Sequence, residues 1–368
     1  ARPDMDALVH THSMHATVLD ADRLGRVLAV DIDRGELRLV GITFRNALVS
    51  DLQALDAAVV VESKSGSVAV ERCVFADNLR QGDGSSSLLG AALSLHSPSS
   101  DGAFRVQDSL FHNNRVESVA GDAGAAGLYL FKAGGTIEVV GNRFENNVTQ
   151  SPGLTSYSAG IIGTSRGKVT FNDNLATGNQ VVGTSAPIWG AITLSAFDSG
   201  GRIVARRNQF VANRSSTGEG AQFSVSLLHT NASALISDTL VAASPKGLGL
   251  NVASRGVARL VNVTVVDNRG GNLALKNTAG TLSLANSLVF GGPGPQTHFE
   301  GTITEVKNLI GTDPLFVSRA ARNYRLRASS PARDHGTSTP PGKLGAVDLD
   351  RTARVKGGKV DLGAYESF

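Results

Sequence analysis

The chain has 368 residues and a formal net charge of +3. Its basic residues are interspersed with acidic ones along the sequence and form no basic cluster, which does not favour nucleic acid as a partner. With 42 glycines and only 5% aromatic residues, the composition favours many short strands and tight turns over long amphipathic helices. A single cysteine excludes an internal disulfide framework, and no apolar run reaches the length of a membrane span.

The first residues, ARPDMDALVH, lack the basic and apolar regions of a signal peptide, so we expect the chain to begin after processing or trimming. His10 and His12 would share one face of a strand, as metal ligands do. Because the only acidic residues close to them are Asp4 and Asp6, we expect no metal site there.

One sequence unit recurs from Gly35 onward. It consists of a glycine, alternating apolar residues, an Asn or Asp, a large apolar residue two positions later, and often a second Asn. Copies begin at Gly35, Gly66, Gly102, Gly135, Gly167 and Gly201. Small-residue segments between the copies begin at Gly90, Ala126, Ala159, Gly190 and Gly220. Both kinds of segment alternate with period 2, which predicts half-buried strands.

A single repeat is too short to enclose a core, but stacked repeats bury one face of every strand. We therefore predict an all-β fold, a parallel β-helix of about ten rungs over residues 1–312, followed by an irregular segment over residues 313–368. The recurring Asn or Asp at the bend predicts a ladder of turn residues formed by Asp108, Asn142, Asn208, Asp238, Asn262 and Asn286. A β-propeller is the alternative, which the missing blade signatures and the drift in repeat length disfavour.

The length of the repeat is uneven along the chain. Residues 233–310 form compact repeats, whereas the repeats within residues 79–220 carry extra residues at one fixed point. These inserts comprise residues 79–90, 115–126, 148–160, 180–190 and 214–220. Since insertions at a fixed point of a solenoid collect on one side, we predict a ridge of five stacked loops beside a shallow groove.

Two sets of motifs resemble known repeat proteins. FxxN tetrapeptides at Phe75–Asn78, Phe111–Asn114, Phe144–Asn147 and Phe210–Asn213 alternate with GAAL, AGLY, AGII and GAIT, and this pattern resembles the repeats of chlamydial polymorphic outer-membrane proteins. The segments DPLF, NYRL, SPARDHG, DLD and DLGAYE, between Asp313 and Glu366, are similar to the carboxy-terminal block of bacterial right-handed β-helix proteins of the choice-of-anchor Q type.

The second resemblance extends from Thr17 to Glu366, with two departures. Arg333 stands where that family usually has Ile, and Arg351 stands where it usually has Gly. The resemblance implies a right-handed coil and an exported bacterial protein, located outside the cell or on its surface. The likeness to the chlamydial repeats implies adhesion.

Residues 313–368 are predicted to cap the coil, because an uncovered last rung exposes a row of unpaired backbone groups. The residues expected to build this cap are Asp313, Tyr324, Asp334, Asp348, Asp350, Arg354 and Glu366. Its acidic side chains would allow structural calcium, but their spacing matches no calcium-binding loop. We therefore expect no cofactor.

Aromatic and hydroxyl side chains gather at the predicted inserts and on the strands that follow them. The candidates for ligand binding are Tyr129, Tyr157, Trp189, Phe197, Ser94 and Thr193. Flat aromatic faces beside hydroxyl groups favour a site for sugar rings. The alternative is that Trp189 and Phe197 fix their loops to the rod.

Catalysis by a β-helix hydrolase would need carboxylates on neighbouring rungs, about 5 to 9.5 Å apart. Asp83, Asp122 and Glu219 are the nearest candidates, and solvated loop charge is the simpler interpretation of them. Our first hypothesis is therefore a non-enzymatic, adhesin-like scaffold that binds polysaccharide or another cell-surface ligand. A polysaccharide lyase or glycoside hydrolase is the alternative, a structural spacer is a third reading, and the catalytic residues and oligomeric state stay open.

Overall fold

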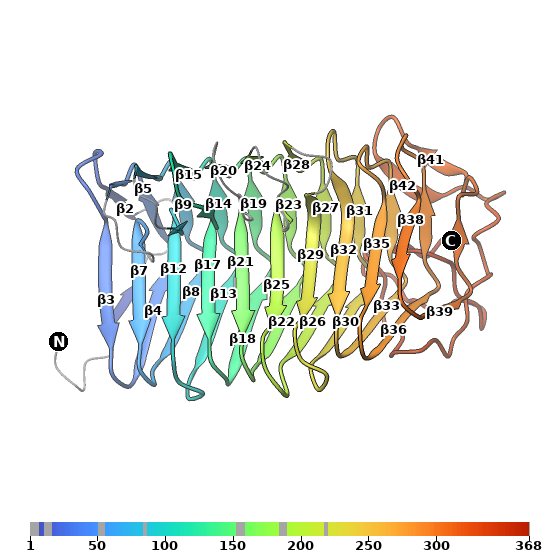
Figure 1. Cartoon of the computed structure of the whole chain (residues 1–368), viewed down its shortest axis with the longest axis horizontal. Helices are drawn as coiled ribbons and strands as arrows, with labels where there is room; N and C mark the ends of the chain where they lie inside the picture. Colours follow the sequence, from blue (N-terminus) through green and yellow to red (C-terminus); the bar gives the residue numbers. More distant parts are fainter. Residues whose placement is uncertain are drawn as a thin grey trace.

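The computed structural model describes residues 7–10, 17–50, 56–83, 87–151, 159–183, 190–216 and 220–367. These residues form a right-handed parallel β-helix, as the sequence predicted, with the rungs stacked along one long axis (Figure 1). Within the described ranges all regular elements are strands, and no helix is long and apolar enough to span a membrane.

Three long parallel sheets, named A, B and C, run along the rod, and the chain visits them in the order C, A, B on each rung. Sheet C contains β3 (Leu28–Ile32), β7 (Val59–Ser63), β12 (Leu93–Ser97), β17 (Leu128–Lys132), β21 (Gly160–Thr164), β25 (Ile192–Ala196), β29 (Ala221–Leu227), β32 (Leu248–Ser254), β35 (Leu273–Asn277) and β38 (Thr297–Glu300). Sheet A contains β1 (Ala7–His10), β4 (Glu36–Val40), β8 (Ser67–Glu71), β13 (Ala103–Gln107), β18 (Thr136–Val140), β22 (Lys168–Asn172), β26 (Arg202–Arg206), β30 (Ser233–Ser237), β33 (Val257–Val261), β36 (Thr281–Ala285) and β39 (Ile303–Val306). Sheet B contains β2 (Thr17–Asp20), β5 (Ile42–Arg45), β9 (Val74–Ala76), β14 (Leu110–His112), β19 (Arg143–Glu145), β23 (Leu175–Thr177), β27 (Gln209–Val211), β31 (Leu240–Ala242), β34 (Thr264–Val266), β37 (Leu288–Phe290) and β40 (Leu309–Ile310).

The inserts expected as loops contain strands of their own. A fourth parallel sheet, sheet D, contains β6 (Leu48–Val49), β10 (Leu79–Gly82), β15 (Arg115–Ser118), β20 (Val148–Ser151), β24 (Gln180–Gly183) and β28 (Arg214–Ser215). Beside it, β11 (Leu88–Leu89) pairs with β16 (Ala123–Gly124). Each insert therefore begins as a strand, because the equivalent residues of the rungs above and below supply its backbone partners.

Phenylalanine rings from successive rungs stack inside the coil. Phe44, Phe75, Phe111 and Phe144 occupy one position of the repeat, and the ring centroids of neighbours lie 5.1, 4.9 and 4.9 Å apart. All four side chains are fully buried. Parallel register places identical side chains one strand spacing apart, so the recurring Phe of the FxxN motif forms a continuous column.

The Asn of the FxxN motif forms a second column at the turn after sheet B. The side-chain amide of Asn114 donates to Asn147 Oδ1 at 2.9 Å, and that of Asn147 donates to Asn179 Oδ1 at the same distance. The Asn147 amide also donates to the carbonyl of Phe111 at 2.9 Å. Each buried amide thus finds its partners on neighbouring rungs, as buried polar groups require.

The predicted turn ladder between sheets A and B is divided between two adjacent columns. Asp108, Asp238, Asn262 and Asn286 have positive φ angles of 50 to 54°, so they occupy the left-handed position of the bend. Asn142 and Asn208 lie one residue later, and the column Asn142–Asn174–Asn208 runs through hydrogen bonds between side-chain amides. The single predicted ladder is corrected accordingly: Asn and Asp suit both the left-handed bend and the buried hydrogen bond.

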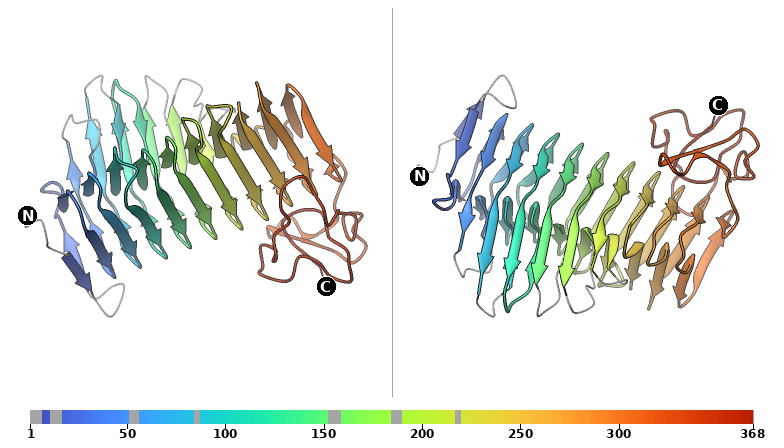
Figure 2. Two further views of the ribbon diagram at one scale, coloured as in Figure 1. Left: turned by 90° about the horizontal axis from the view of Figure 1, so that it is seen from below. Right: turned by 90° about the horizontal axis from the view of Figure 1, so that it is seen from above.

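The carboxy-terminal segment, residues 313–367, packs against the side of the last rungs (Figure 2). It contains the antiparallel pair β41 (Phe316–Ser318) and β42 (Asn323–Leu326). Its apolar side chains contact outward residues of sheet B such as Leu240 and Leu288. The strands of the last rung, β38 to β40, keep exposed or half-buried residues, so this placement differs from the cover expected over the open end.

Candidate functional site

Three hollows follow one another along the outer face of sheet C. The amino-terminal hollow involves β3, β7 and β12, the middle hollow involves β17, β21 and β25, and the carboxy-terminal hollow involves β32, β35 and β38. Because these strands belong to one continuous parallel sheet, the hollows lie in sequence along the axis of the rod. This arrangement fits an extended ligand better than a compact one.

The side chains on this face are small, aliphatic or aromatic over the middle of the sheet. Alternation along each strand points every second residue outward, and parallel register aligns these residues from rung to rung. One outward row runs Ser94, Tyr129, Ile161, Thr193 and Ser224. The row is uncharged, because the sequence supplies hydroxyl and apolar side chains at each of these positions.

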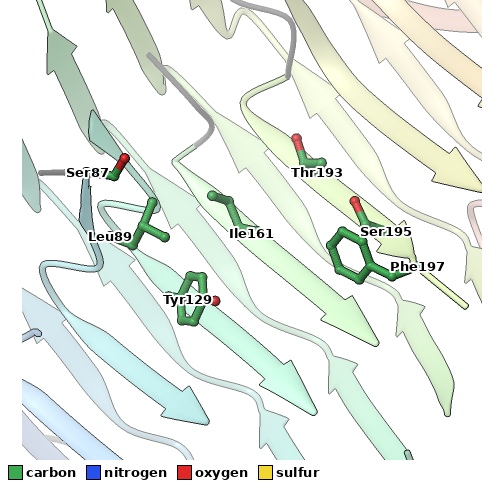
Figure 3. A pocket seen from close by; sticks show the side chains of 7 residues that line it. All are labelled: Ser87, Leu89, Tyr129, Ile161, Thr193, Ser195 and Phe197. Carbon is green, nitrogen blue, oxygen red and sulfur yellow. The ribbon is translucent and has the colours of Figure 1, made fainter. Parts of the chain in front are cut away.

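The side chains that line the middle hollow are drawn in Figure 3. The hollow has a volume of about 280 Å³. Its described lining residues are Ser87, Leu89, Tyr129, Ile161, Thr193, Ser195 and Phe197. This volume lies just below the range of roughly 300 to 1,000 Å³ that small-molecule sites occupy. The lining is mainly apolar with a few hydroxyl groups, which is the usual composition of such a site.

Aromatic side chains form a second row beside the hydroxyl groups. The rings of His96 and Phe131 stack with centroids 5.7 Å apart, and Phe131 meets Phe197 at 5.9 Å with an interplanar angle of 54°. Phe197 follows the end of β25, and 40% of it is exposed. Gly163 provides the room for this ring, because a Cβ at position 163 would lie 2.8 Å from Phe197 Cε2.

Two hydroxyl groups on this face are buried without a hydrogen-bond partner among the described residues. They are Thr193 Oγ1 and Ser224 Oγ, and the two residues are neighbours in register on β25 and β29. Thr193 lines the middle hollow. Burial also raises the pKa of the nearby Tyr129 hydroxyl, which therefore stays protonated and able to donate a hydrogen bond.

The structure brings together three of the six predicted ligand-binding residues. Tyr129, Thr193 and Phe197 line the middle hollow, and Ser94 lies beside Tyr129 in register, one rung earlier. Tyr157 and Trp189 lie outside the described residues. Sequence reasoning missed Ile161 and Ser195, although both follow from extending the outward alternation to β21 and β25.

The amino-terminal hollow holds carboxylates that the sequence interpretation missed. Asp31, Glu62 and His96 are register neighbours on β3, β7 and β12, and all three line this hollow. Asp33 also lines it and forms an ion pair with Lys64, with 2.7 Å between the carboxylate oxygen and Nζ. The sequence does contain a signal for this cluster: Asp31 and Glu62 are acidic residues at the same strand position of two successive repeats.

The carboxy-terminal hollow has both charged and apolar lining residues. The Glu300 carboxylate forms an ion pair with Lys276, with 2.6 Å between Oε2 and Nζ. Its other oxygen lies 3.2 Å from His298 Nε2. These interactions lower the pKa of Glu300, and the hydrogen bond from Lys276 is the largest cause. Leu273 and Pro295 form part of the apolar lining.

Of the acidic residues considered for catalysis, the described ones, Asp83 and Asp122, do not lie on the strands of sheet C. Asp83 lines a separate hollow near sheet D together with Glu117. Asp122 accepts a long hydrogen bond of 3.4 Å from Ser87, and Glu219 lies outside the described residues.

The expected cap residues form hydrogen-bond networks within the carboxy-terminal segment and with the rod. Buried Arg354 donates to Asp238 Oδ1 at 2.7 Å, which ties the segment to the turn before β31. The Tyr324 hydroxyl contacts Asp267 Oδ2 at 3.2 Å, and burial raises the pKa of this hydroxyl. The Asp348 carboxylate accepts the backbone N–H groups of Thr352 and Glu366.

The remaining cap residues lie nearer the surface. Asp350 forms a two-bond ion pair with Arg325, with both distances 2.6 Å. Asp313 accepts the backbone N–H of Leu315, and Asp334 donates its own N–H to Asp361. Among the described residues, no group of three or more His, Cys, Asp or Glu side chains is arranged to hold a metal ion.

Comparison of the chain with models of protein families, with curated proteins and with solved structures finds no match. The geometry of the outer face of sheet C is therefore the basis for a functional proposal.

Proposed function

We propose that the chain is a non-enzymatic binding scaffold whose ligand, an extended polysaccharide, lies along the outer face of sheet C. The observation that carries this proposal is the line of three hollows on one continuous parallel sheet. A polymer with repeating units can contact all three hollows at once, and such multiple contacts raise the overall affinity without requiring a deep pocket.

The rigidity of the rod also supports this proposal. The strands of sheet C between β3 and β38 are paired on both sides, so their backbone is already ordered and loses little conformational freedom on binding. The exported, cell-surface location and adhesive role that the sequence resemblances imply are consistent with such a scaffold, and we include them in the proposal.

A matched pair of substitutions on one rung tests the proposal. Ile161→Arg places a long charged side chain in the middle hollow, whereas Thr170→Arg places the same side chain on the outward row of sheet A. A panel of immobilised neutral and acidic polysaccharides is probed with both variants and the parent chain. We expect Ile161→Arg to weaken binding more than tenfold and Thr170→Arg to leave it unchanged.

Two outcomes would overturn the proposal. One is that no polysaccharide in the panel binds the parent chain. The other is that both variants bind as the parent does, which would place the ligand on another face.

The amino-terminal hollow favours a second candidate function, that of a carbohydrate-active enzyme. Asp31 and Glu62 are register neighbours on adjacent strands, whose backbones lie about 4.8 Å apart in a sheet, so their carboxyl groups can approach the shorter separation that glycoside hydrolysis uses. Reducing-end and ultraviolet-absorbance assays on the same polysaccharides would detect product. Turnover that Asp31→Asn and Glu62→Gln both abolish would support this function, and absence of product from every polysaccharide would reject it.

A further inference from the structure

We propose that the middle hollow is a subsite for one uncharged sugar ring, with Phe197 as the surface on which the ring packs and Thr193 as a hydrogen-bond partner. This inference rests on the proposed function, because it names the chemical class of ligand that the face of sheet C would select. It does not depend on the amino-terminal and carboxy-terminal hollows, which contain charged lining residues.

Charge is the first reason for this choice of ligand. None of the seven described residues that line the middle hollow carries a formal charge. An acidic sugar would leave its carboxylate or sulfate without an Arg or Lys partner among these described lining residues, and an unpaired charge in such a site is costly. The nearest hollow along sheet C contains Asp31, Asp33 and Glu62 against one lysine, Lys64, which pairs with Asp33; the remaining negative charge of this hollow would repel an anionic chain.

The second reason is the state of the hydroxyl groups. The Thr193 side chain is nearly inaccessible, with 3% of the residue exposed, and Oγ1 has no hydrogen-bond partner among the described residues. Leaving a buried polar group unpaired costs about 1 to 3 kcal/mol. A sugar hydroxyl can both donate and accept, so a bound ring would supply the missing hydrogen bond. Ser195, two residues along β25, adds another hydroxyl to the same lining (Figure 3).

The third reason is the aromatic surface. The ring of Phe197 is 40% exposed and lines the hollow, with Tyr129 on a neighbouring part of the lining (Figure 3). The carbon–hydrogen faces of a pyranose ring are apolar and pack on aromatic rings, which carry negative charge on their faces. Gly163 fixes the position of the Phe197 ring, since any side chain at position 163 would displace it.

The experiment compares a neutral oligosaccharide, a glucan of six units, with a uronate oligosaccharide of equal length, using calorimetric titration of the whole chain. The variants are Thr193→Val and Phe197→Ala, and the matched control is Thr170→Val on sheet A of the preceding rung. We expect the neutral ligand to bind more tightly, Thr193→Val to weaken it five- to tenfold, and Phe197→Ala to weaken it more than tenfold. Thr170→Val should leave binding unchanged.

Gly163→Ala provides a variant that removes no contact group and still moves the ring. We expect it to weaken neutral-sugar binding by several fold, with a melting temperature close to that of the parent chain. Melting temperatures of all variants show whether a loss of binding comes from unfolding.

The inference falls if the uronate ligand binds as tightly as the neutral one, or if Thr193→Val and Phe197→Ala bind the glucan as the parent chain does. In either case the proposed function still stands, provided that Ile161→Arg weakens binding. If neither oligosaccharide nor any polysaccharide binds, both the inference and the proposed function fall.

Discussion

Polar side chains are buried both inside the coil and on the outer face of sheet C, but their hydrogen bonding differs. In the interior, Asn147 receives a bond from the rung before and donates to the rung after. On sheet C, Thr193 and Ser224 are also buried and aligned in register, yet neither hydroxyl has a partner among the described residues. Stacking alone therefore does not pair every repeated polar group.

The difference follows from side-chain length and position. An Asn amide carries a donor and an acceptor far enough from the backbone to bridge about 4.8 Å between rungs, and the turn directs it along the axis. A Ser or Thr hydroxyl in the middle of a strand is shorter and points perpendicular to the sheet. Paired groups stabilise the rod, whereas the hydroxyls of Thr193 and Ser224 add no hydrogen bond among the described residues.

The largest effect is expected where a charged pair joins the carboxy-terminal segment to the rod. Arg354→Met would leave the buried Asp238 carboxylate without its cation, at a cost of about 3 to 5 kcal/mol. Hydrogen exchange and limited proteolysis should then show opening of residues 313–367. Arg325→Met is the control, because the exposed pair with Asp350 contributes less than about 1 kcal/mol. Equal opening in both variants would contradict the assigned role of Arg354.

The next effect concerns the interior amide column. Asn147→Leu would remove the oxygen that accepts from the side-chain amide and the backbone N–H of Asn114, and also the amide that donates to the Phe111 carbonyl and to Asn179 Oδ1. This loss should destabilise the rod by about 2 to 4 kcal/mol. Denaturant unfolding followed by circular dichroism measures this change. The control is Asn146→Gly at the exposed left-handed position, where φ is 55° and glycine is tolerated. If Asn147→Leu lost less stability than Asn146→Gly, the amide column would not be needed for the stability of the rod.

A smaller, pH-dependent effect is expected at Glu366. Burial raises the pKa of its carboxyl group to about 7, above the value near 4.3 expected in an unfolded chain. Its contribution to stability is therefore complete below about pH 4 and is lost as the pH rises through about 7. Proteolysis of the carboxy-terminal segment should become faster over this interval, and Glu366→Gln should flatten the dependence. Slower proteolysis at higher pH would contradict the direction of the shift.

The smallest effect on stability is expected on the face of sheet C. Thr193→Val removes a buried hydroxyl that has no partner, so the melting temperature should stay the same or rise slightly. This result contrasts with Asn147→Leu, which also replaces a buried polar group by an apolar one. A marked fall in melting temperature for Thr193→Val would show that this hydroxyl is already hydrogen-bonded in the free protein.

The fold could be predicted from the sequence because its signal repeats. Phe75, Phe111 and Phe144 recur at one position of successive units, and each FxxN Asn follows at a fixed distance. A period of this kind specifies stacking directly, since every rung requires the same residue at the same place. The sequence pattern does not separate the left-handed bend at Asp108 from the buried amide at Asn142. Asn and Asp suit both positions, so the two adjacent columns look like one ladder of turn residues.

The candidate site could be predicted only in part. The outward alternation of β17 and β25 is enough to select Tyr129 and Thr193. The fit between Gly163 and the Phe197 ring depends on the register between β21 and β25, which the sequence does not specify to the residue. Sheet D was missed for a related reason: four-residue strands such as Val148–Ser151 depend on pairing with their neighbours more than on their own pattern.

Hydroxyl-radical footprinting, with and without the polysaccharide that binds most tightly, tests the proposed binding face most directly. Tyr129 and Phe197 should be oxidised less when the polysaccharide is present, whereas Leu24, which is 89% exposed and lines none of the three hollows, should be oxidised equally. Unchanged oxidation of Tyr129 and Phe197, with protection of residues on sheet A or the carboxy-terminal segment instead, would contradict a binding site on sheet C.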